Sequence, residues 1–228
     1  MKAKVTRLPA ADRDLAHLKE RFLSAHESYA TLRDSCKSSV GHWQWASDLV
    51  CELDPLFFLD HGIAVGQISK APPANPLRWV AYGFSGEGRL VEERRYTELP
   101  GRYYHGFYEY LQDRIIGQLF DHSPARHVIN CSQLIFDASG PAYFQRWGTR
   151  GWVSYTYACT NRRVDAYVGV AKEHDDSERH FSGQLLYKEN GILERWEREQ
   201  DNRPVAIFRG RPPAADDPFV RVFSAAET

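Results

Sequence analysis

The sequence lacks an excess of charge of either sign and any long apolar run. Its 228 residues include 29 Lys and Arg against 30 Asp and Glu, a formal net charge of −1. Without a global basic field, the chain has no general attraction for nucleic acids or anionic membranes, so neither is expected as a partner. No segment approaches the roughly 18 apolar residues of a membrane span, and the first residues lack a signal-peptide pattern. We therefore expect a soluble, cytoplasmic protein.

Closely spaced cysteines are also absent. The chain has four cysteines, Cys36, Cys51, Cys131 and Cys159, and none belongs to a C-x-x-C pair. This spacing argues against a structural zinc site and against a small disulfide scaffold. Buried free thiols are expected instead.

The motifs of common enzyme classes are missing. Gly86-Glu87-Gly88 precedes a strand pattern, not a helix, and so does not predict a phosphate-binding loop. Neither G-x-S-x-G nor H-E-x-x-H occurs, which removes the usual hydrolase and zinc-protease signatures. The loop Glu173–Asp176 with His180 has side chains of metal-ligand types. Contiguous loop residues point in different directions, however, so we expect a solvated charge run and neither a metal nor a cofactor.

Hydrophobic residues make up 43% of the chain, enough for a sizeable core. We expect one domain over residues 1–228. The Pro-rich connector Ala71–Pro76 divides it into a segment of helix and short strands, residues 1–76, and a sheet segment, residues 77–228.

Three segments show a helical pattern. Apolar residues recur at alternating spacings of three and four after Asp12, which predicts an amphipathic helix from Asp12 to Arg33 packed on a sheet. The stripe of this first helix consists of Leu15, Leu18, Phe22, Ala25, Tyr29 and Leu32. The segment Val40–Leu53 predicts a second helix, and an apolar stripe between Tyr104 and Leu119 predicts a third.

Several other segments predict strands. Asn190-Gly191 is the strongest hairpin signal, because a two-residue type I′ turn needs positive φ at both central positions. Hairpins are also expected over 78–96 and 152–170. Further strands are expected at Leu56–Leu59, Ile63–Val65, Val128–Phe136, Tyr143–Trp147 and Val205–Phe208. The expected fold class is therefore α+β: a curved antiparallel sheet of repeated hairpins, open or partly closed into a barrel, with N-terminal and mid-chain helices packed on it.

The hairpins contain an internal repeat. Trp79–Phe84 and Trp152–Tyr157 match at nearly every position, with Trp, Val, Tyr and an aromatic residue in one register. A duplicated hairpin explains the match, because each copy buries its apolar face beside the next.

These copies resemble the YD repeat of RHS-type proteins, which has the pattern tyrosine, any residue, tyrosine, aspartate, two residues, glycine, arginine, leucine. Tyr82–Leu90 is the first copy, Tyr155–Arg163 the second, and Leu185–Leu193 the third. All three copies lack the aspartate, which is replaced by Ser85, Ala158 and Lys188. Asn161 stands in the glycine position of the second copy, and Leu185 and Ile192 stand where the third should have tyrosine and arginine. The resemblance extends over Arg78 to Arg198 and implies a sheet of hairpins without an enclosing shell.

Small proteins built from a few such hairpins resemble immunity proteins of bacterial polymorphic toxin systems. The resemblance implies a bacterial, non-enzymatic protein that binds another protein, with a cognate toxin as the expected partner. Trp, Tyr and Arg dominate interface hot spots. The candidate binding residues are therefore two aromatic and arginine-rich clusters, Arg146, Trp147 and Arg150, and Arg195, Trp196 and Arg198.

A small-molecule site, enzymatic or carrier, is the alternative. In this case the sheet encloses an aromatic cavity on which a few polar groups converge. Asp60 and His61 form an acid–base pair there if Cys131 or Ser132 supplies a nucleophile. The candidate lining residues are Asp60, His61, Tyr104, Tyr108, His127, Tyr155 and Tyr157.

Overall fold

The computed structural model of this chain describes residues 10–69, 71–191, 193–201 and 203–208. In this part the strands form one antiparallel sheet of 13 strands, in the order β13-β12-β11-β10-β9-β8-β7-β6-β5-β4-β3-β1-β2. From β3 onward, neighbours in the sheet are also neighbours in the sequence, so hairpins build the sheet. The sheet is not closed, because β13 and β2 lie at its two ends.

Two helices accompany the strands, α1 (Ala10–Ser39) and α2 (Phe57–His61). The strands are β1 (Val40–Ala46), β2 (Ile68–Ser69), β3 (Val80–Ser85), β4 (Leu90–Tyr96), β5 (Tyr103–Tyr110), β6 (Arg114–Phe120), β7 (Val128–Asp137), β8 (Gly140–Gly148), β9 (Gly151–Thr160), β10 (Arg163–Glu173), β11 (Glu178–Tyr187), β12 (Leu193–Gln200) and β13 (Arg203–Phe208).

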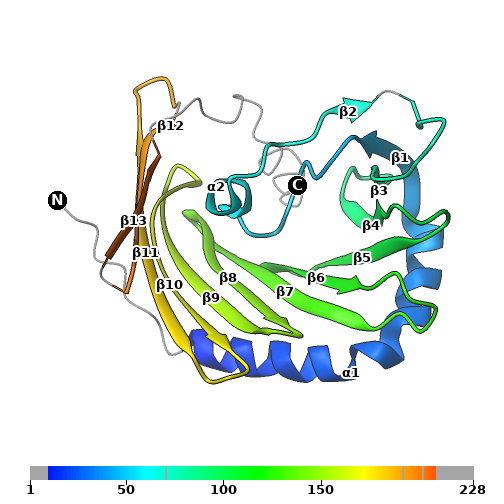
Figure 1. Cartoon of the computed structure of the whole chain (residues 1–228), viewed down its shortest axis with the longest axis horizontal. Helices are drawn as coiled ribbons and strands as arrows, with labels where there is room; N and C mark the ends of the chain where they lie inside the picture. Colours follow the sequence, from blue (N-terminus) through cyan, green and yellow to red (C-terminus); the bar gives the residue numbers. More distant parts are fainter. Residues whose placement is uncertain (1–9, 70, 192, 202, 209–228) are drawn as a thin grey trace.

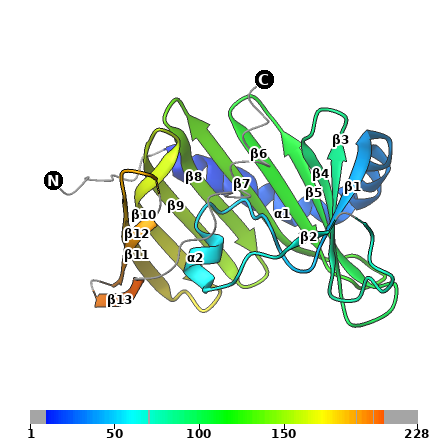
Figure 2. The same ribbon diagram turned by 90° about the horizontal axis from the view of Figure 1, so that it is seen from above.

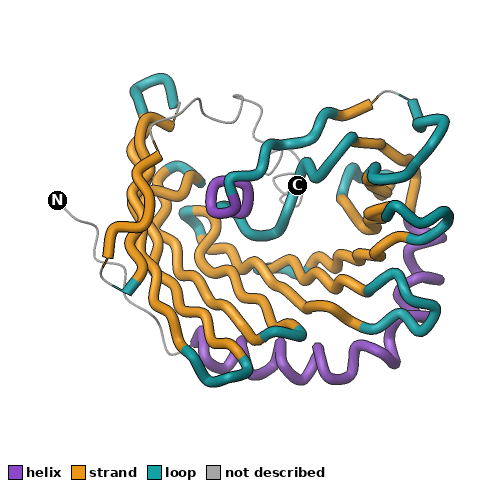
Figure 3. Tube along the Cα trace, in the orientation of Figure 1, coloured by secondary structure: helices purple, strands orange, loops and turns teal. Residues whose placement is uncertain are grey.

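The sheet is strongly curved, and its two faces are covered differently (Figure 1). Helix α1 runs along the convex face. Residues 47–67, which link β1 to β2 and include α2, lie on the concave side, and we call them the inserted segment. Figure 2 shows the same arrangement from above. Figure 3 shows that most of the inserted segment is loop. The protein therefore has three layers, with the sheet between α1 and the inserted segment.

The convex core lies between α1 and the middle of the sheet. Leu18 and Ala25 of α1 are each 1% exposed and pack with Phe107, Phe120 and Cys131 of the strands. These helix positions belong to the predicted stripe, so the prediction of an amphipathic helix packed on a sheet is confirmed. Its observed end at Ser39 is six residues beyond the predicted Arg33.

The concave core is larger and includes the inserted segment. Val50, Cys51, Leu53 and Leu56 of this segment are at most 5% exposed and pack against the sheet. Burial of four apolar side chains, each contributing about 1.5–3 kcal/mol, makes the segment an integral part of the fold. The sheet contributes mainly aromatic and aliphatic side chains: Tyr82, Phe84, Leu134, Phe144, Tyr155, Tyr157, Tyr167, Phe181, Leu185 and Trp196.

Two of the three helix predictions are wrong. Val40–Ala46 is a strand, in which Trp43 and Trp45 point to the same face because side chains alternate along a strand. The predicted helix between Tyr104 and Leu119 is the hairpin β5–β6. Both faces of this hairpin are covered, so apolar residues occur on both and produce a false helical spacing.

The inserted segment is also predicted incorrectly. The expected strand Leu56–Leu59 is mostly the short helix α2, which ends where Gly62 adopts a φ of 61°. Residues 63–65 are loop rather than a strand. The apolar pattern of these residues does not predict their secondary structure, because they are buried by packing on the sheet and not by strand pairing of their own.

The three predicted hairpins are confirmed as β3–β4, β9–β10 and β11–β12. The predicted two-residue type I′ turn at Asn190-Gly191 is wrong, because only Gly191 of the pair has a positive φ, of 80°. The N–H of Gly191 donates to the carbonyl of Lys188, so the turn is formed by residues 188–191.

Leu185 of β11 lies directly opposite Trp196 of β12, and both are buried on the concave face. Simple alternation across the turn predicts Ile192 on this face and Leu193 on the other. The side chain of Ile192 lies outside the described residues, and Leu193 packs in the concave core with Leu185 and Trp196, because the register shifts between Leu186 and Tyr187. The predicted strands over 128–136, 143–147 and 205–208 correspond to β7, β8 and β13.

Candidate functional site

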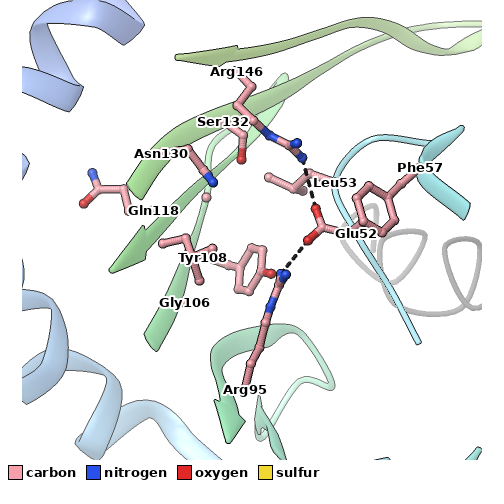
Figure 4. A pocket seen from close by; sticks show the side chains of 12 residues that line it. Glu52, Leu53, Phe57, Arg95, Gly106, Tyr108, Gln118, Asn130, Ser132 and Arg146 are labelled. Atoms are coloured by element: carbon pink, nitrogen blue, oxygen red, sulfur yellow. Dashed lines mark hydrogen bonds and ion pairs between the residues drawn. The ribbon is translucent and has the colours of Figure 1, made fainter. Parts of the chain in front are cut away.

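A pocket of about 90 Å³ lies on the concave face, between the inserted segment and strands β4 to β8. Figure 4 shows its side chains converging from the sheet and from the inserted segment. It is lined by Glu52, Leu53, Phe57, Arg95, Gly106, Tyr108, Gly117, Gln118, Leu119, Asn130, Ser132 and Arg146.

Two glycines form the floor of the pocket. Gly117 of β6 pairs with Tyr108 of β5, and Gly106 lies two residues before Tyr108. A Cβ atom at Gly117 would lie 2.8 Å from Cδ1 of Leu53 and 3.1 Å from Oγ of Ser132. The absence of a side chain at this position therefore lets the inserted segment approach the sheet and leaves room beside Ser132.

Glu52 lies between two arginines from different strands. Its carboxylate accepts hydrogen bonds from Nη2 of Arg95 on β4, at 2.5 Å, and from Nη2 of Arg146 on β8, at 3.2 Å. Burial favours a higher pKa for Glu52, but the two guanidinium groups outweigh it and hold the pKa below its ordinary value. Glu52 is therefore ionised at neutral pH, and it ties the inserted segment to two strands.

Glu93 is a second carboxylate beside Arg95. It is fully buried on β4 and accepts hydrogen bonds from Nε of Arg95, at 2.5 Å, and from the hydroxyl of Tyr108, at 2.6 Å. Burial and the charge of Glu93 raise the pKa of Tyr108 well above its ordinary value. Tyr108 consequently remains protonated and acts as a donor.

The pocket retains unused hydrogen-bonding capacity. Nε of Arg146 is buried and has no hydrogen-bond partner among the described residues. Asn130 and Ser132 of β7 line the pocket at alternate positions on the concave face, beside Arg146. An amide, a hydroxyl and a guanidinium group are thus available for a polar ligand group.

A second group of buried polar residues joins α2 to β9, β10 and β12. Asp54 accepts a hydrogen bond from the hydroxyl of Tyr157 at 3.1 Å, and Asp60 lies 3.6 Å from Nη1 of Arg198. Burial and the nearby charge of Asp54 raise the pKa of Asp60 to about 6, although Arg198 lowers it in part. The hydroxyl of Tyr167 contributes to the same cluster. These contacts hold α2 against the wall of the sheet.

The six candidate binding residues do not form one surface. Arg146 lines the pocket, and Trp196 and Arg198 lie on the concave wall, where Arg198 covers the ring of Phe181 at 4.9 Å. The other three residues are elsewhere.

Trp147 is packed with the convex core, with Nζ of Lys19 above its ring at 5.2 Å. Arg195 and Trp196 project from opposite faces of β12, and Arg195 pairs with Glu197. Arg150 is exposed in the turn between β8 and β9. Alternation along the strands separates neighbours in sequence onto opposite faces.

The residues of the alternative cavity are only partly brought together. Asp60, Tyr155 and Tyr157 lie in the group that holds α2, and the pKa of Tyr155 is raised by burial and by the charges of Asp54 and Asp60. Tyr108 belongs to the pocket on the other side of the inserted segment.

The remaining three residues of this set are outside both groups. His61 is exposed on α2 and its ring nitrogen contacts the carbonyl of Phe57 at 2.9 Å. Tyr104 is only partly buried and contacts His122 edge to face. His127 is exposed in the loop between β6 and β7.

The four thiols are unsuited to nucleophilic chemistry. Burial raises the pKa of Cys36 to about 11 and those of Cys131 and Cys159 to about 12, and it raises the pKa of Cys51 well above its ordinary value. Cys131 lies in the convex core, on the opposite face of the sheet from Asp60, so these two residues do not form an acid–base and nucleophile pair. The described residues include no group of three His, Cys, Asp or Glu side chains that is suited to a metal ion.

The sequence interpretation did not include Glu52, Arg95, Asn130 or the two floor glycines. The sequence does contain a signal for the buried charged residue and a signal for the floor glycines. Glu52 and Asp54 are charged residues within an otherwise apolar segment, and Gly106 and Gly117 interrupt aromatic and aliphatic strands. Buried charges and strand glycines both point to close approach of another part of the chain.

No protein-family model matches the sequence, and no curated protein or solved structure is significantly similar to it. Among the described residues, no helix combines the length and apolar character that crossing a membrane requires.

Proposed function

We propose that this chain is a non-enzymatic binding protein whose concave pocket receives a carboxamide side chain, Asn or Gln, of a protein partner. The observation that carries the proposal is a set of side-chain polar groups that have no hydrogen-bond partner in the described part of the chain, Asn130, Ser132 and Nε of Arg146, beside Glu52 and above a glycine floor. A buried polar group without a partner is costly, and a ligand that satisfies it gains affinity.

The local charge balance favours a neutral ligand group. Glu52 and Glu93 carry two negative charges, and Arg95 and Arg146 carry two positive charges, so the ion pairs neutralise one another. A carboxylate or an ammonium group would bring an unpaired charge into this site, which is unfavourable. A carboxamide both donates and accepts hydrogen bonds, and it matches the mixture of donors and acceptors in the pocket.

The titration properties of the lining residues support binding in preference to catalysis. A general acid or base works best with a pKa near the working pH. The pKa of Glu52 is held below its ordinary value and that of Tyr108 far above its own, so neither residue is suited to exchange a proton near neutral pH.

We propose a bacterial toxin as the partner, because the hairpins resemble those of immunity proteins. The test is co-purification of the tagged chain with the products of adjacent genes. We expect one of them to be retained by the wild type and lost with Asn130→Leu, which keeps the volume and removes the donor and acceptor. If no adjacent product binds, the toxin form is wrong.

A small molecule is the second candidate ligand, because the pocket volume of about 90 Å³ admits a small amide without a protein attached. Acetamide and glutamine are suitable probes. Stabilisation of the wild type but not of Asn130→Leu by these probes, without retention of any protein, would favour the small-molecule form. Identical responses of the two proteins to every probe and partner would contradict binding in this pocket altogether.

A further inference from the structure

A separate depression of about 410 Å³ lies on the convex side of the molecule. It is bounded by the C-terminal half of α1, the turn between β4 and β5, and the loop between β6 and β7. The side chains that define its chemistry are Tyr29, Arg33, Arg102, Tyr103, His122 and Arg126. None of them belongs to the concave pocket. We propose that this depression is a binding site for a phosphate group, and we call it the convex site.

Two of the three arginines of the convex site have no carboxylate partner among the described residues. The third, Arg33, pairs with Asp34. Arg102 and Arg126 instead donate to main-chain carbonyls, Arg102 to His122 at 3.4 Å and Arg126 to Tyr103 at 2.6 Å. Neither of these two arginines forms an ion pair with a carboxylate in the described part of the chain.

The nearest loop carboxylate is already committed. Asp121 accepts hydrogen bonds from the hydroxyl of Ser123, at 2.7 Å, and from the N–H of His127, at 3.0 Å. These bonds close the loop that carries Arg126. Asp121 therefore shapes the convex site without pairing with its arginines.

Arg126 is held in a specific orientation. Its φ of 53° lies in the left-handed region, which is unfavourable for a residue with a side chain. Its guanidinium group lies 4.6 Å from the ring centroid of Tyr103 and 5.7 Å from that of Tyr29. The loop thus accepts backbone strain and fixes a cation against two aromatic rings, which is an arrangement for presenting its N–H groups to a ligand.

Two buried residues hold the side chain of Tyr29 in place. Its hydroxyl lies 3.0 Å from Nδ1 of His105, and Nε2 of His105 lies 2.8 Å from Glu92. His105 and Glu92 are each 1% exposed. Tyr29 is therefore a positioning residue for Arg126, with its hydroxyl directed inward.

The ligand chemistry follows from the donors. Guanidinium groups bind phosphate through paired N–H donors, and Arg102 and Arg126 approach the depression from two different loops, which suits the several oxygens of a tetrahedral oxyanion. The depression is larger than a phosphate ion requires, so a phosphate monoester is the expected ligand. The ester group comes from a free metabolite or from a phosphorylated side chain of a protein.

The test is calorimetric titration of the full chain with inorganic phosphate, phenyl phosphate and a phosphoserine peptide. Arg102→Gln alters an exposed side chain, and Arg126→Lys keeps the charge but removes the planar fork. Arg150→Gln, at an exposed turn residue, is the matched control. We expect each site variant to weaken binding by about tenfold, the value of one charge-assisted contact, and the control to bind as the wild type does.

Preference for the phosphoserine peptide over phenyl phosphate would identify a protein-borne phosphate, and the reverse a free metabolite. Wild-type affinity in both site variants would overturn the proposal. So would the absence of any binding at about 10 mM ligand, a concentration that saturates sites with a Kd of about 1 mM. Circular dichroism of the variants confirms that they are folded. Because the concave pocket is not involved, Asn130→Leu binds phosphate normally if the convex site is correct, whatever the outcome for the concave pocket.

Discussion

Glu52 of the inserted segment forms a buried ion pair with Arg95 of β4, 43 residues along the chain. Both side chains are largely buried, with exposed fractions of 10% and 21%. Because Arg146 contacts the same carboxylate, one acidic residue pairs with guanidinium groups from two separated strands. This arrangement makes the inserted segment part of the wall of the pocket.

Glu52→Gln should lower the free energy of unfolding by about 3 kcal/mol, because it leaves buried positive charge without its partner. Urea denaturation at pH 7 measures the change. Glu98→Gln is the control, since Glu98 forms an ion pair with Arg78 in which both side chains are more than 70% exposed, and it should have almost no effect. Equal effects of the two substitutions would contradict a structural role for the Glu52 pair.

Gly117→Ala should lower the free energy of unfolding by about 1–3 kcal/mol, because the new Cβ atom would press on Leu53. Gly86→Ala is a matched control, since nothing lies within 4 Å of a Cβ at Gly86. Thermal unfolding of both variants gives the comparison. A Gly117→Ala protein as stable as Gly86→Ala would mean that the inserted segment is not held against the strand.

Asp60 should make stability fall with rising pH. Burial raises its folded pKa to about 6 from an ordinary value of 3.8, so the folded protein keeps a proton that the unfolded chain has already lost. The stability that Asp60 contributes is fully present below its pKa in the unfolded chain and is lost as pH rises through its pKa in the folded protein. Relative to the wild type, Asp60→Asn should gain about 2 kcal/mol between pH 4 and pH 6.

Denaturant titrations across this pH range measure the gain. Asp48→Asn changes an exposed residue of the same segment and controls for the general effect of removing an acid. A constant difference between Asp60→Asn and the wild type over the whole range would show that folding does not raise the pKa of Asp60, which would contradict its burial beside Asp54.

The thiols should react slowly in the folded protein. At pH 8 all four are protonated, because burial raises the pKa of Cys36 to about 11, those of Cys131 and Cys159 to about 12, and that of Cys51 well above its ordinary value. A disulfide reagent should therefore modify them over hours in buffer and within minutes in urea, with the partly buried Cys159 first. Immediate reaction of one thiol in buffer would indicate an activated cysteine and would contradict the non-enzymatic proposal.

Local signals in the sequence predict those parts of the fold that depend on local geometry. Asn190-Gly191 identifies a turn because few residues adopt positive φ, and the stripe from Leu15 to Leu32 identifies a helix that buries one face. Tyr82 and Tyr155, matched in the sequence repeat, both point into the concave core.

The rest depends on contacts between distant segments. Trp43 and Trp45 lie in a strand because β3 pairs with this strand, with partner residues 34 or more positions later in the chain. Leu56–Leu59 is an apolar run whether it is a buried strand or a helix docked on the sheet. The pocket is harder still to predict, because its charged residues Glu52, Arg95 and Arg146 belong to three segments that only the curvature of the sheet brings together.

Binding of a partner in the concave pocket is tested most directly by the partner affinity of two arginine variants. Arg146→Gln removes the guanidinium group that lines the pocket, and Arg150→Gln makes the same change four residues away at an exposed turn. With a partner obtained by co-purification, we predict that Arg146→Gln weakens binding by about tenfold or more. Arg150→Gln should bind as the wild type does. Equal affinities of the two folded variants would contradict binding in the concave pocket.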